Sequence, residues 1–110
     1  MHDNQPAMAY PRVECSSLEE VRGHIDTLDR EIVALLAARG HYVRQAARFK
    51  RTTDDVRAPQ RVEQVIAKVR ALAEQTGAAP DVIEAIYRTM IAAFTEQELQ
   101  EHRAVQSSTD

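Results

Sequence analysis

Residues 18–50 read LEEVRGHIDTLDREIVALLAARGHYVRQAARFK, and this stretch decides the fold. Core-type positions recur in it at alternating steps of three and four residues, which places their side chains on one face of an α-helix. In chain order these positions are Leu18, Val21, Ile25, Leu28, Ile32, Leu35, Arg39, Tyr42 or Val43, Ala46 and Phe49. The spacing predicts one helix of about 33 residues and ~50 Å, at about 1.5 Å per residue.

Arg39 is the charged residue in this otherwise apolar series. A guanidinium does not lose its charge near neutral pH, and an unpaired buried charge is very costly. The inner face of the helix therefore needs an anion at Arg39. Two partners fit this requirement: a protein carboxylate such as Glu98, or a bound ligand.

Residues that start or end helices divide the rest of the chain. Ser17 begins a capping box with Glu20, which starts the long helix. Residues 51–58 are polar and aperiodic, which indicates a loop. Pro59 suits the first turn of a second helix that ends before Gly77, and Pro80 opens a third. We expect a mobile tail over residues 1–14, a helical domain over 15–103 and a frayed tail over 104–110.

The predicted fold is all-α, with one long and two shorter helices per chain. Helices of roughly 17 and 22 residues are too short to cover a helix of ~50 Å. A single chain would leave much of the apolar series in water. An intertwined helical homodimer, in which two long helices pack together, solves this problem. A coiled-coil dimer without a ligand site is the simpler alternative, and polar residues at core positions count against it.

Composition excludes several classes of protein. The net charge of −3 and the 5% aromatic content argue against nucleic-acid and membrane-surface binding. No apolar run is long enough for a transmembrane helix. The single Cys15 forms no internal disulfide, so we expect a reducing, cytoplasmic setting. The four histidines have no ligand-like spacing with one another or with Cys15, so neither a metal nor another cofactor is expected.

Three further charged residues complete the candidate site. Lys50 lies about three turns after Arg39 on nearly the same face, although a lysine also suits a helix C-terminus. Glu98 follows Phe94 on the inner face of the third helix, where a carboxyl must be paired or protonated. Gln97 would replace it if the register were one residue different. Arg22 lies 17 residues from Arg39, so it reaches the same small ligand only from a partner chain, or else it is a solvated flank residue.

A locally basic segment surrounds these positions. Its members are Arg44, Arg48, Lys50, Arg51, Arg57 and Arg61. The segment either guides a small polyanion toward the site or forms a solvated helix face. A cationic, dry pocket without a nucleophile suits recognition of a compact dicarboxylate. It also suits catalysis by conformational restriction and electrostatics.

The chain resembles the all-α chorismate mutase family over about 85 of its residues. The resemblance lies in the spacing of Arg22, Asp26 and Asp29, the LLAAR segment that ends at Arg39, and the run to Lys50. It continues through APQRV at 58–62 and through the third helix. It implies an intertwined dimer of three-helix chains with two equivalent sites, and no cofactor.

By resemblance, Arg39 and the Arg22 of the partner chain bind the two substrate carboxylates. Lys50 donates to the ether oxygen whose C–O bond breaks. Glu98 stands where the family has a second donor, usually glutamine, and donates only when it is protonated. The same resemblance puts Arg61 near the site, and Ile91 and Thr95 on its wall.

Two reactions fit the resemblance. The first is rearrangement of chorismate to prephenate, and the second is conversion of isochorismate to salicylate and pyruvate. Two segments of the chain, HYVRQAARFK and APQRV, look closer to the lyases. The usual mutases of the family carry acidic residues at the positions that align with Ala58 and Val62. Glu98 departs from the lyase pattern. We place the mutase slightly ahead, with an amino analogue of chorismate as a further substrate and a catalytically silent, partner-binding helical dimer as the competing class.

Overall fold

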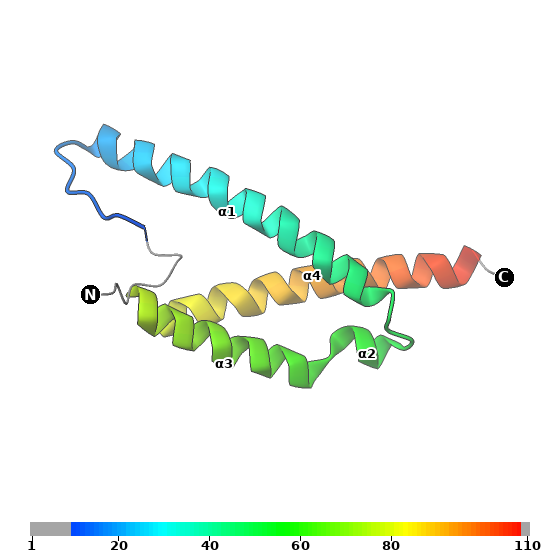
Figure 1. Cartoon of the computed structure of the whole chain (residues 1–110). Coiled ribbons are helices and arrows are strands. Elements are labelled where there is room, and N and C mark those ends of the chain that lie inside the picture. The colour runs from blue at the N-terminus through cyan, green and yellow to red at the C-terminus, as the bar shows by residue number, and fades with distance from the viewer. Residues whose placement is uncertain (1–9, 109–110) are drawn as a thin grey trace, which may run out of the picture.

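The computed structural model describes residues 10–108, and side chains through residue 104. It contains three long helices and one short helix (Figure 1): α1 (Leu18–Ala47), α2 (Thr53–Arg57), α3 (Pro59–Thr76) and α4 (Pro80–Ser108). No strand occurs among the described residues. The all-α class is therefore confirmed. The predicted tail over 1–14 lies largely outside the described residues, and α4 continues five residues beyond 103, where the helical domain was expected to end.

The helix ends follow local chemistry. The Ser17 side chain accepts a hydrogen bond from the Glu20 backbone N–H at the start of α1, as the capping box predicts. Pro59 occupies the first turn of α3, and Gly77 ends that helix at φ 83°, in the left-handed region that glycine tolerates. The loop predicted over residues 51–58 instead contains α2. Its start is fixed by a reciprocal capping box between Thr52 and Asp55.

The packed core lies mainly between α3 and α4. Leu99 of α4 is 1% exposed, and the other buried apolar side chains are Val56, Ile66, Val69 and Ala73. Apolar positions of α3 recur at helical spacing, so one face of that helix is buried against α4. This pair of helices forms the platform on which α2 and the end of α1 rest.

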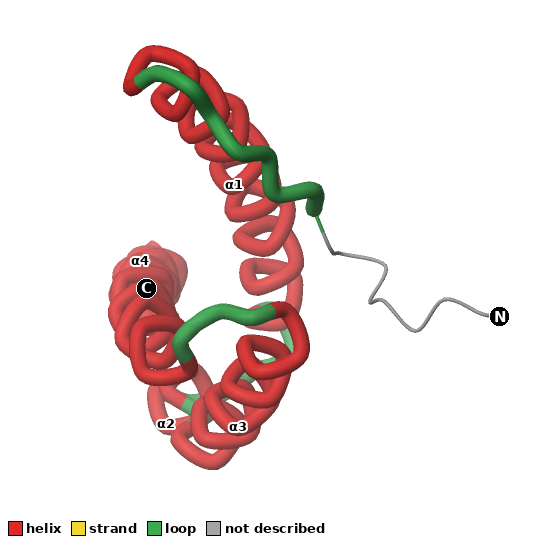
Figure 2. The backbone as a smooth tube through the Cα atoms, turned by 90° about the vertical axis from the view of Figure 1, so that its left-hand side faces the viewer, coloured by secondary structure: helices red, strands yellow, loops and turns green. Residues whose placement is uncertain are grey.

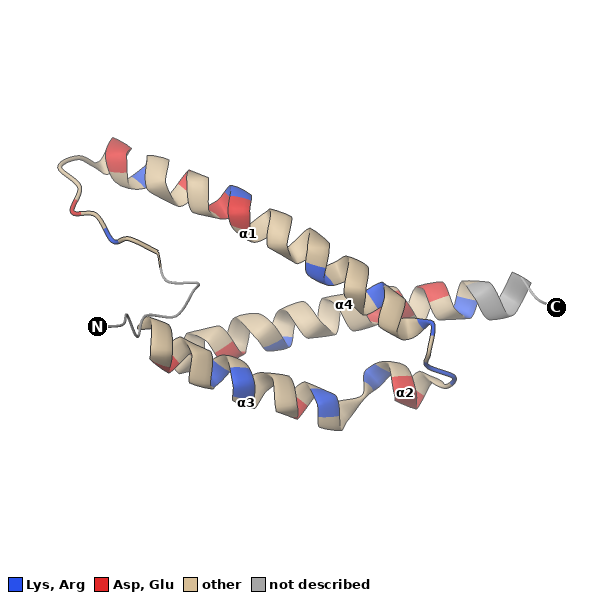
Figure 3. Ribbon diagram, viewed as in Figure 1, with Lys and Arg blue, Asp and Glu red and all other residues tan. Residues whose placement is uncertain are grey.

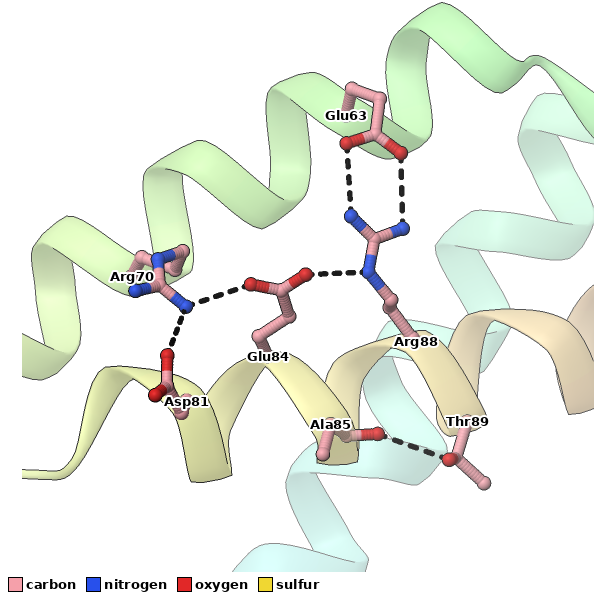
Figure 4. Close-up of polar contacts among 7 residues, drawn as sticks. All are labelled: Glu63, Arg70, Asp81, Glu84, Ala85, Arg88 and Thr89. Atoms are coloured by element: carbon pink, nitrogen blue, oxygen red, sulfur yellow. Dashed lines mark hydrogen bonds and ion pairs between the residues drawn. The ribbon is translucent and has the colours of Figure 1, made fainter.

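A chain of ion pairs crosses the outer surface of the α3–α4 pair (Figure 4). Arg88 donates to both carboxylate oxygens of Glu63, at 2.9 and 3.0 Å, and to Glu84 at 2.7 Å. Glu84 also accepts from Arg70, which contacts Asp81 at 2.9 Å. The bidentate geometry and the shared carboxylate fix the register of α3 against α4.

Helix α1 meets the platform near its C-terminal end and diverges from it toward the N-terminus (Figures 1 and 2). Gly40 is buried at the crossing, where an added Cβ would lie 2.9 Å from Phe94 Cε1. The inner face of α1 was expected to be core, yet its N-terminal part is exposed within one chain. Val21, Ile25, Leu28, Ile32 and Leu35 are 38–64% exposed.

No helix among the described residues is both long enough and apolar enough to cross a membrane.

Candidate functional site

One cavity of about 470 Å³ lies where the end of α1, α2, the start of α3 and the second half of α4 converge. This volume falls within the range of pockets that hold small molecules. The lining residues are Arg39, Tyr42, Val43, Ala46, Lys50, Val56, Arg57, Ala58, Arg61, Val62, Val65, Ile91, Phe94, Thr95 and Glu98. Each wall of the cavity thus comes from a different segment of the chain.

Helix α1 and the turn after it supply two of the cations. Arg39 belongs to the helical face that the sequence predicted to point inward, and Lys50 follows the last turn of α1. The Lys50 backbone N–H donates to the Ala47 carbonyl at 3.1 Å, which continues the helical winding past the end of the helix. Arg39 and Lys50 therefore lie in the same cavity, as their spacing predicted.

The junction between α2 and α3 supplies two more cations. Val56 is 3% exposed and anchors α2 in the core. Ala58 ends α2 and begins α3 with φ 41°, a left-handed conformation that costs a residue with a Cβ of order 1 kcal/mol or more. The chain reverses direction there, and the residues on either side, Arg57 and Arg61, both line the cavity. Figure 3 shows this gathering of Lys and Arg around the end of α1, α2 and the start of α3.

Glu98 is the one acidic residue on the wall of the cavity. It is 5% exposed, and its Oε2 lies 3.7 Å from Lys50 Nζ. That separation allows ionic attraction but is too long for a hydrogen bond, and Oε2 has no hydrogen-bond partner among the described residues. Burial raises the pKa of Glu98, Lys50 partly opposes this shift, and the nearby Glu101 carboxylate reinforces it. Burial dominates, so the pocket favours the protonated acid.

The structure decides between the two kinds of partner expected for Arg39, a protein carboxylate and a bound ligand. No carboxylate of the described residues lies within ion-pair distance of its guanidinium, and Glu98 is beside Lys50 instead. The Arg39 guanidinium lies over the Tyr87 ring in a cation–π contact, with its central carbon 5.7 Å from the ring centroid. An aromatic face stabilises a cation without neutralising it. The positive charge of Arg39 is therefore available to a ligand.

The charge balance of the cavity defines what it can bind. Four basic side chains face one carboxyl whose pKa is raised by burial: Arg39, Lys50, Arg57 and Arg61 against Glu98. The rest of the wall is largely apolar, with Val62, Val65 and Phe94 prominent, so a ligand that enters leaves water behind. Such a pocket suits a compact molecule with more than one negative charge.

Six of the seven residues predicted for the site line this cavity: Arg39, Lys50, Arg61, Ile91, Thr95 and Glu98. Arg22 is exposed on the diverging part of α1 and lies outside the cavity of its own chain. Gln97 is exposed, so Glu98 has the inward register. Arg57 was missed as a site residue, although it was counted in the basic segment. Its place depends on the turn at Ala58, which the sequence did not reveal.

One group of possible metal ligands lies apart from the cavity. Atoms of Cys15, Glu20 and His24 are within 4.8 Å of one another at the start of α1. The spacing of these residues did not predict the group, because Cys15 precedes the helix and approaches the other two only through the bend at Ser16 and Ser17. Glu20 already accepts hydrogen bonds from the Ser16 backbone and hydroxyl.

The fold and the cavity define a class of protein. Three long helices and the short α2 enclose a cationic pocket with a buried carboxyl; α4, with 29 residues, is nearly as long as α1 and longer than the sequence predicted. The model of the type II chorismate mutase family matches residues 21–99. The chain belongs to this family, and it is an enzyme of this fold. Among curated proteins it is similar to the isochorismate pyruvate lyase of Pseudomonas aeruginosa. The two are 29% identical over 86 residues, which cover 78% of this chain and 85% of the relative.

Proposed function

We propose that the protein is a chorismate mutase, which rearranges chorismate to prephenate in the cavity between α1, α2 and α4. The observation that carries this proposal is the gathering of Arg39, Lys50 and the buried Glu98 carboxyl on one small pocket. The rearrangement forms a C–C bond while an ether C–O bond breaks, and it needs no nucleophile. Catalysis then consists of holding the folded conformer and stabilising the charge that develops on the ether oxygen.

Each group has a distinct task in this mechanism. Arg39 binds one substrate carboxylate through charge-assisted hydrogen bonds, and Arg61 adds positive charge on the same wall. The Lys50 ammonium donates a hydrogen bond to the ether oxygen. Glu98 in its protonated form donates a second hydrogen bond to that atom. Ile91 and Thr95 restrict the space available to the ring, which favours the compact reactive conformer.

A second candidate is the lyase reaction, which converts isochorismate to salicylate and pyruvate. Two observations favour it: the similarity to a protein named isochorismate pyruvate lyase, and the absence of acidic side chains from the wall formed by Ala58 and Val62. Both reactions break the same kind of C–O bond, so Lys50 and Glu98 serve either one. The candidates differ in how the ring and its hydroxyl group are held.

Product analysis separates the candidates. The purified protein is incubated separately with chorismate and with isochorismate, and the products are identified by chromatography. Prephenate as the dominant product, at a turnover typical of enzymes, supports the mutase. Salicylate and pyruvate in equal amounts, with only slow formation of prephenate, make the lyase the principal function. If neither substrate reacts, an amino analogue of chorismate or a silent, partner-binding helical dimer takes precedence.

The active form that we propose is a homodimer, in which Arg22 of the partner chain binds the second substrate carboxylate. The exposed apolar face of α1 supports this form, because a single chain leaves its inner face in water. A second cavity of about 1080 Å³ between α1, α3 and α4, lined by Leu28, Leu72 and Ile83 among others, offers room for apolar side chains of a second copy.

Mixing two inactive variants tests the shared site. Arg22→Ala and Arg39→Ala each disable both sites of a homodimer. After the two variants are denatured together and refolded, about half of the dimers are mixed, and each mixed dimer has one intact site. Activity should return to about a quarter of the wild-type value, because about half of the dimers are mixed and half of the sites in each mixed dimer are intact. If the mixture stays inactive while the refolded wild type recovers, Arg22 does not act across the interface.

A further inference from the structure

Tyr87 lies between the candidate site and the second cavity described above. Its ring is half-buried on α4 and lines the second cavity, together with Leu28 and Ile83. Arg39, which lines the first cavity, places its guanidinium carbon over this ring, 5.7 Å from the ring centroid. Tyr87 itself does not line the first cavity. The contact thus joins the candidate site to a part of the molecule outside it.

The nature of this contact matters for ligand binding. Arginine has a long side chain with considerable rotamer entropy, so its guanidinium needs a partner if it is to keep one orientation. A carboxylate partner would hold Arg39 equally well, but it would compete with any anionic ligand for the same N–H groups. A tyrosine ring attracts the cation through its π face and, unlike a carboxylate, does not take up the guanidinium N–H groups in strong hydrogen bonds. Tyr87 thus restrains the Arg39 side chain without neutralising its positive charge.

The position of Tyr87 on α4 supports the same role. Ile91, one turn further along this helix, lines the first cavity directly. Tyr87 and Ile91 therefore share a face of α4, and the ring stands at the edge of the site, where it reaches the guanidinium rather than the ligand. No ion pair competes for Arg39 among the described residues.

We propose that Tyr87 is a positioning residue that holds the Arg39 guanidinium toward the pocket with its charge free for a substrate carboxylate. This inference rests on the proposed function for the identity of the ligand. Tyr87 makes no contact with the reacting atoms. It acts through Arg39, and the aromatic face rather than the hydroxyl group is the part that matters.

Kinetics on three variants of the full-length protein test the proposal. In Tyr87→Leu the aromatic face is lost, and KM for the accepted substrate should rise about five- to thirtyfold, with a smaller change in kcat. Tyr87→Phe keeps the face and should stay within about twofold of the wild-type KM. Met90→Ala, half-buried one turn along α4 and outside both cavities, controls for lost packing. A fall in kcat with unchanged KM in Tyr87→Leu, or an equal rise in KM for Tyr87→Phe, would overturn the proposal.

A measurement without substrate separates this proposal from the proposed function. The side-chain Nε–H resonance of Arg39, assigned by its absence in Arg39→Lys, should be displaced upfield by the ring current of Tyr87. The displacement should persist in Tyr87→Phe and Met90→Ala and vanish in Tyr87→Leu. If the wild type shows no displacement, Tyr87 does not hold Arg39, whatever the enzyme does. If the displacement is present but neither substrate reacts, the proposed function fails while the restraint on Arg39 stands.

Discussion

The proposed mechanism predicts that activity of the wild type declines as pH rises, and that replacing Glu98 by glutamine removes this decline. In the proposed mechanism Glu98 donates a hydrogen bond only when it is protonated, and burial raises its pKa above the ordinary value. Glutamine keeps a donor of nearly the same shape but does not titrate. The Lys50 ammonium lies 3.7 Å from the Glu98 carboxyl, so the two groups can reach the same substrate atom.

The steepness of the expected decline in activity follows from the loss of a single proton from Glu98. Above the raised pKa of Glu98, kcat/KM of the wild type should fall about tenfold per pH unit, because only the protonated fraction is active. The Glu98→Gln variant should give a flat profile from pH 5 to 9. Both profiles come from initial rates of substrate consumption in buffers of constant ionic strength. Glu96→Gln, an exposed neighbour on α4 outside the cavity, is the matched control and should follow the wild type.

The same protonation should appear in stability. Because the pKa of Glu98 is raised on folding, its contribution favours the folded state below the ordinary carboxyl pKa and is lost as pH rises toward the folded-state pKa. Over that window the free energy of unfolding should fall by about 1.4 kcal/mol per pH unit, and Glu98→Gln should not show this part of the decline. Urea titrations at several pH values measure it. Parallel profiles for the wild type and Glu98→Gln, in both activity and stability, would refute the reasoning.

Two other changes probe the frame around the site. Gly40→Ala should destabilise the protein by about 1–3 kcal/mol in urea unfolding and lower activity, because the new Cβ meets Phe94 on the wall of the cavity; an unchanged unfolding midpoint would show that Phe94 yields freely. Ile32→Asp puts a charge on the exposed apolar face of α1 and should give monomers in sedimentation velocity, together with loss of activity, whereas Asp29→Asn on the same helix should leave the dimer intact. Dimers that survive Ile32→Asp would contradict the role proposed for this face.

Much of the fold could be predicted because its boundaries have local causes. Pro59, Gly77 and Pro80 mark the ends of α3 and the start of α4, and the three- and four-residue spacing from Leu18 identifies α1. These signals act within a few residues of the chain, so they can be read without knowledge of the tertiary structure.

The short helix α2 was missed for a different reason. Its capping box, Thr52 with Asp55, is present in the sequence, but five residues provide too little periodicity to identify a helix. Arg57 was missed as a site residue because its place at the cavity depends on the positive φ of Ala58. Alanine rarely adopts such a conformation, so the sequence does not predict it.

Long-range pairing was the other limit. The inward position of Arg39 could be predicted from its place in the apolar series, but the choice between a carboxylate and a free charge depends on how α1 crosses α4. In the structure Lys50 lies beside Glu98, and Arg39 lies over the Tyr87 ring. Each contact joins residues that are about 48 positions apart in the sequence. The exposed apolar face of α1 is a second example. The periodicity of the sequence predicts which side chains should be buried, but it does not predict which surface covers them.

The most direct test of the mechanism is the turnover of Lys50→Ala. In the proposed mechanism Lys50 stabilises charge that develops on the ether oxygen, so its loss should lower kcat by about a hundred- to a thousandfold on the substrate that the wild type accepts. Circular dichroism and the urea midpoint should stay close to those of Lys68→Ala, which removes an exposed lysine of α3. A folded Lys50→Ala protein with wild-type kcat would contradict electrostatic catalysis in this cavity.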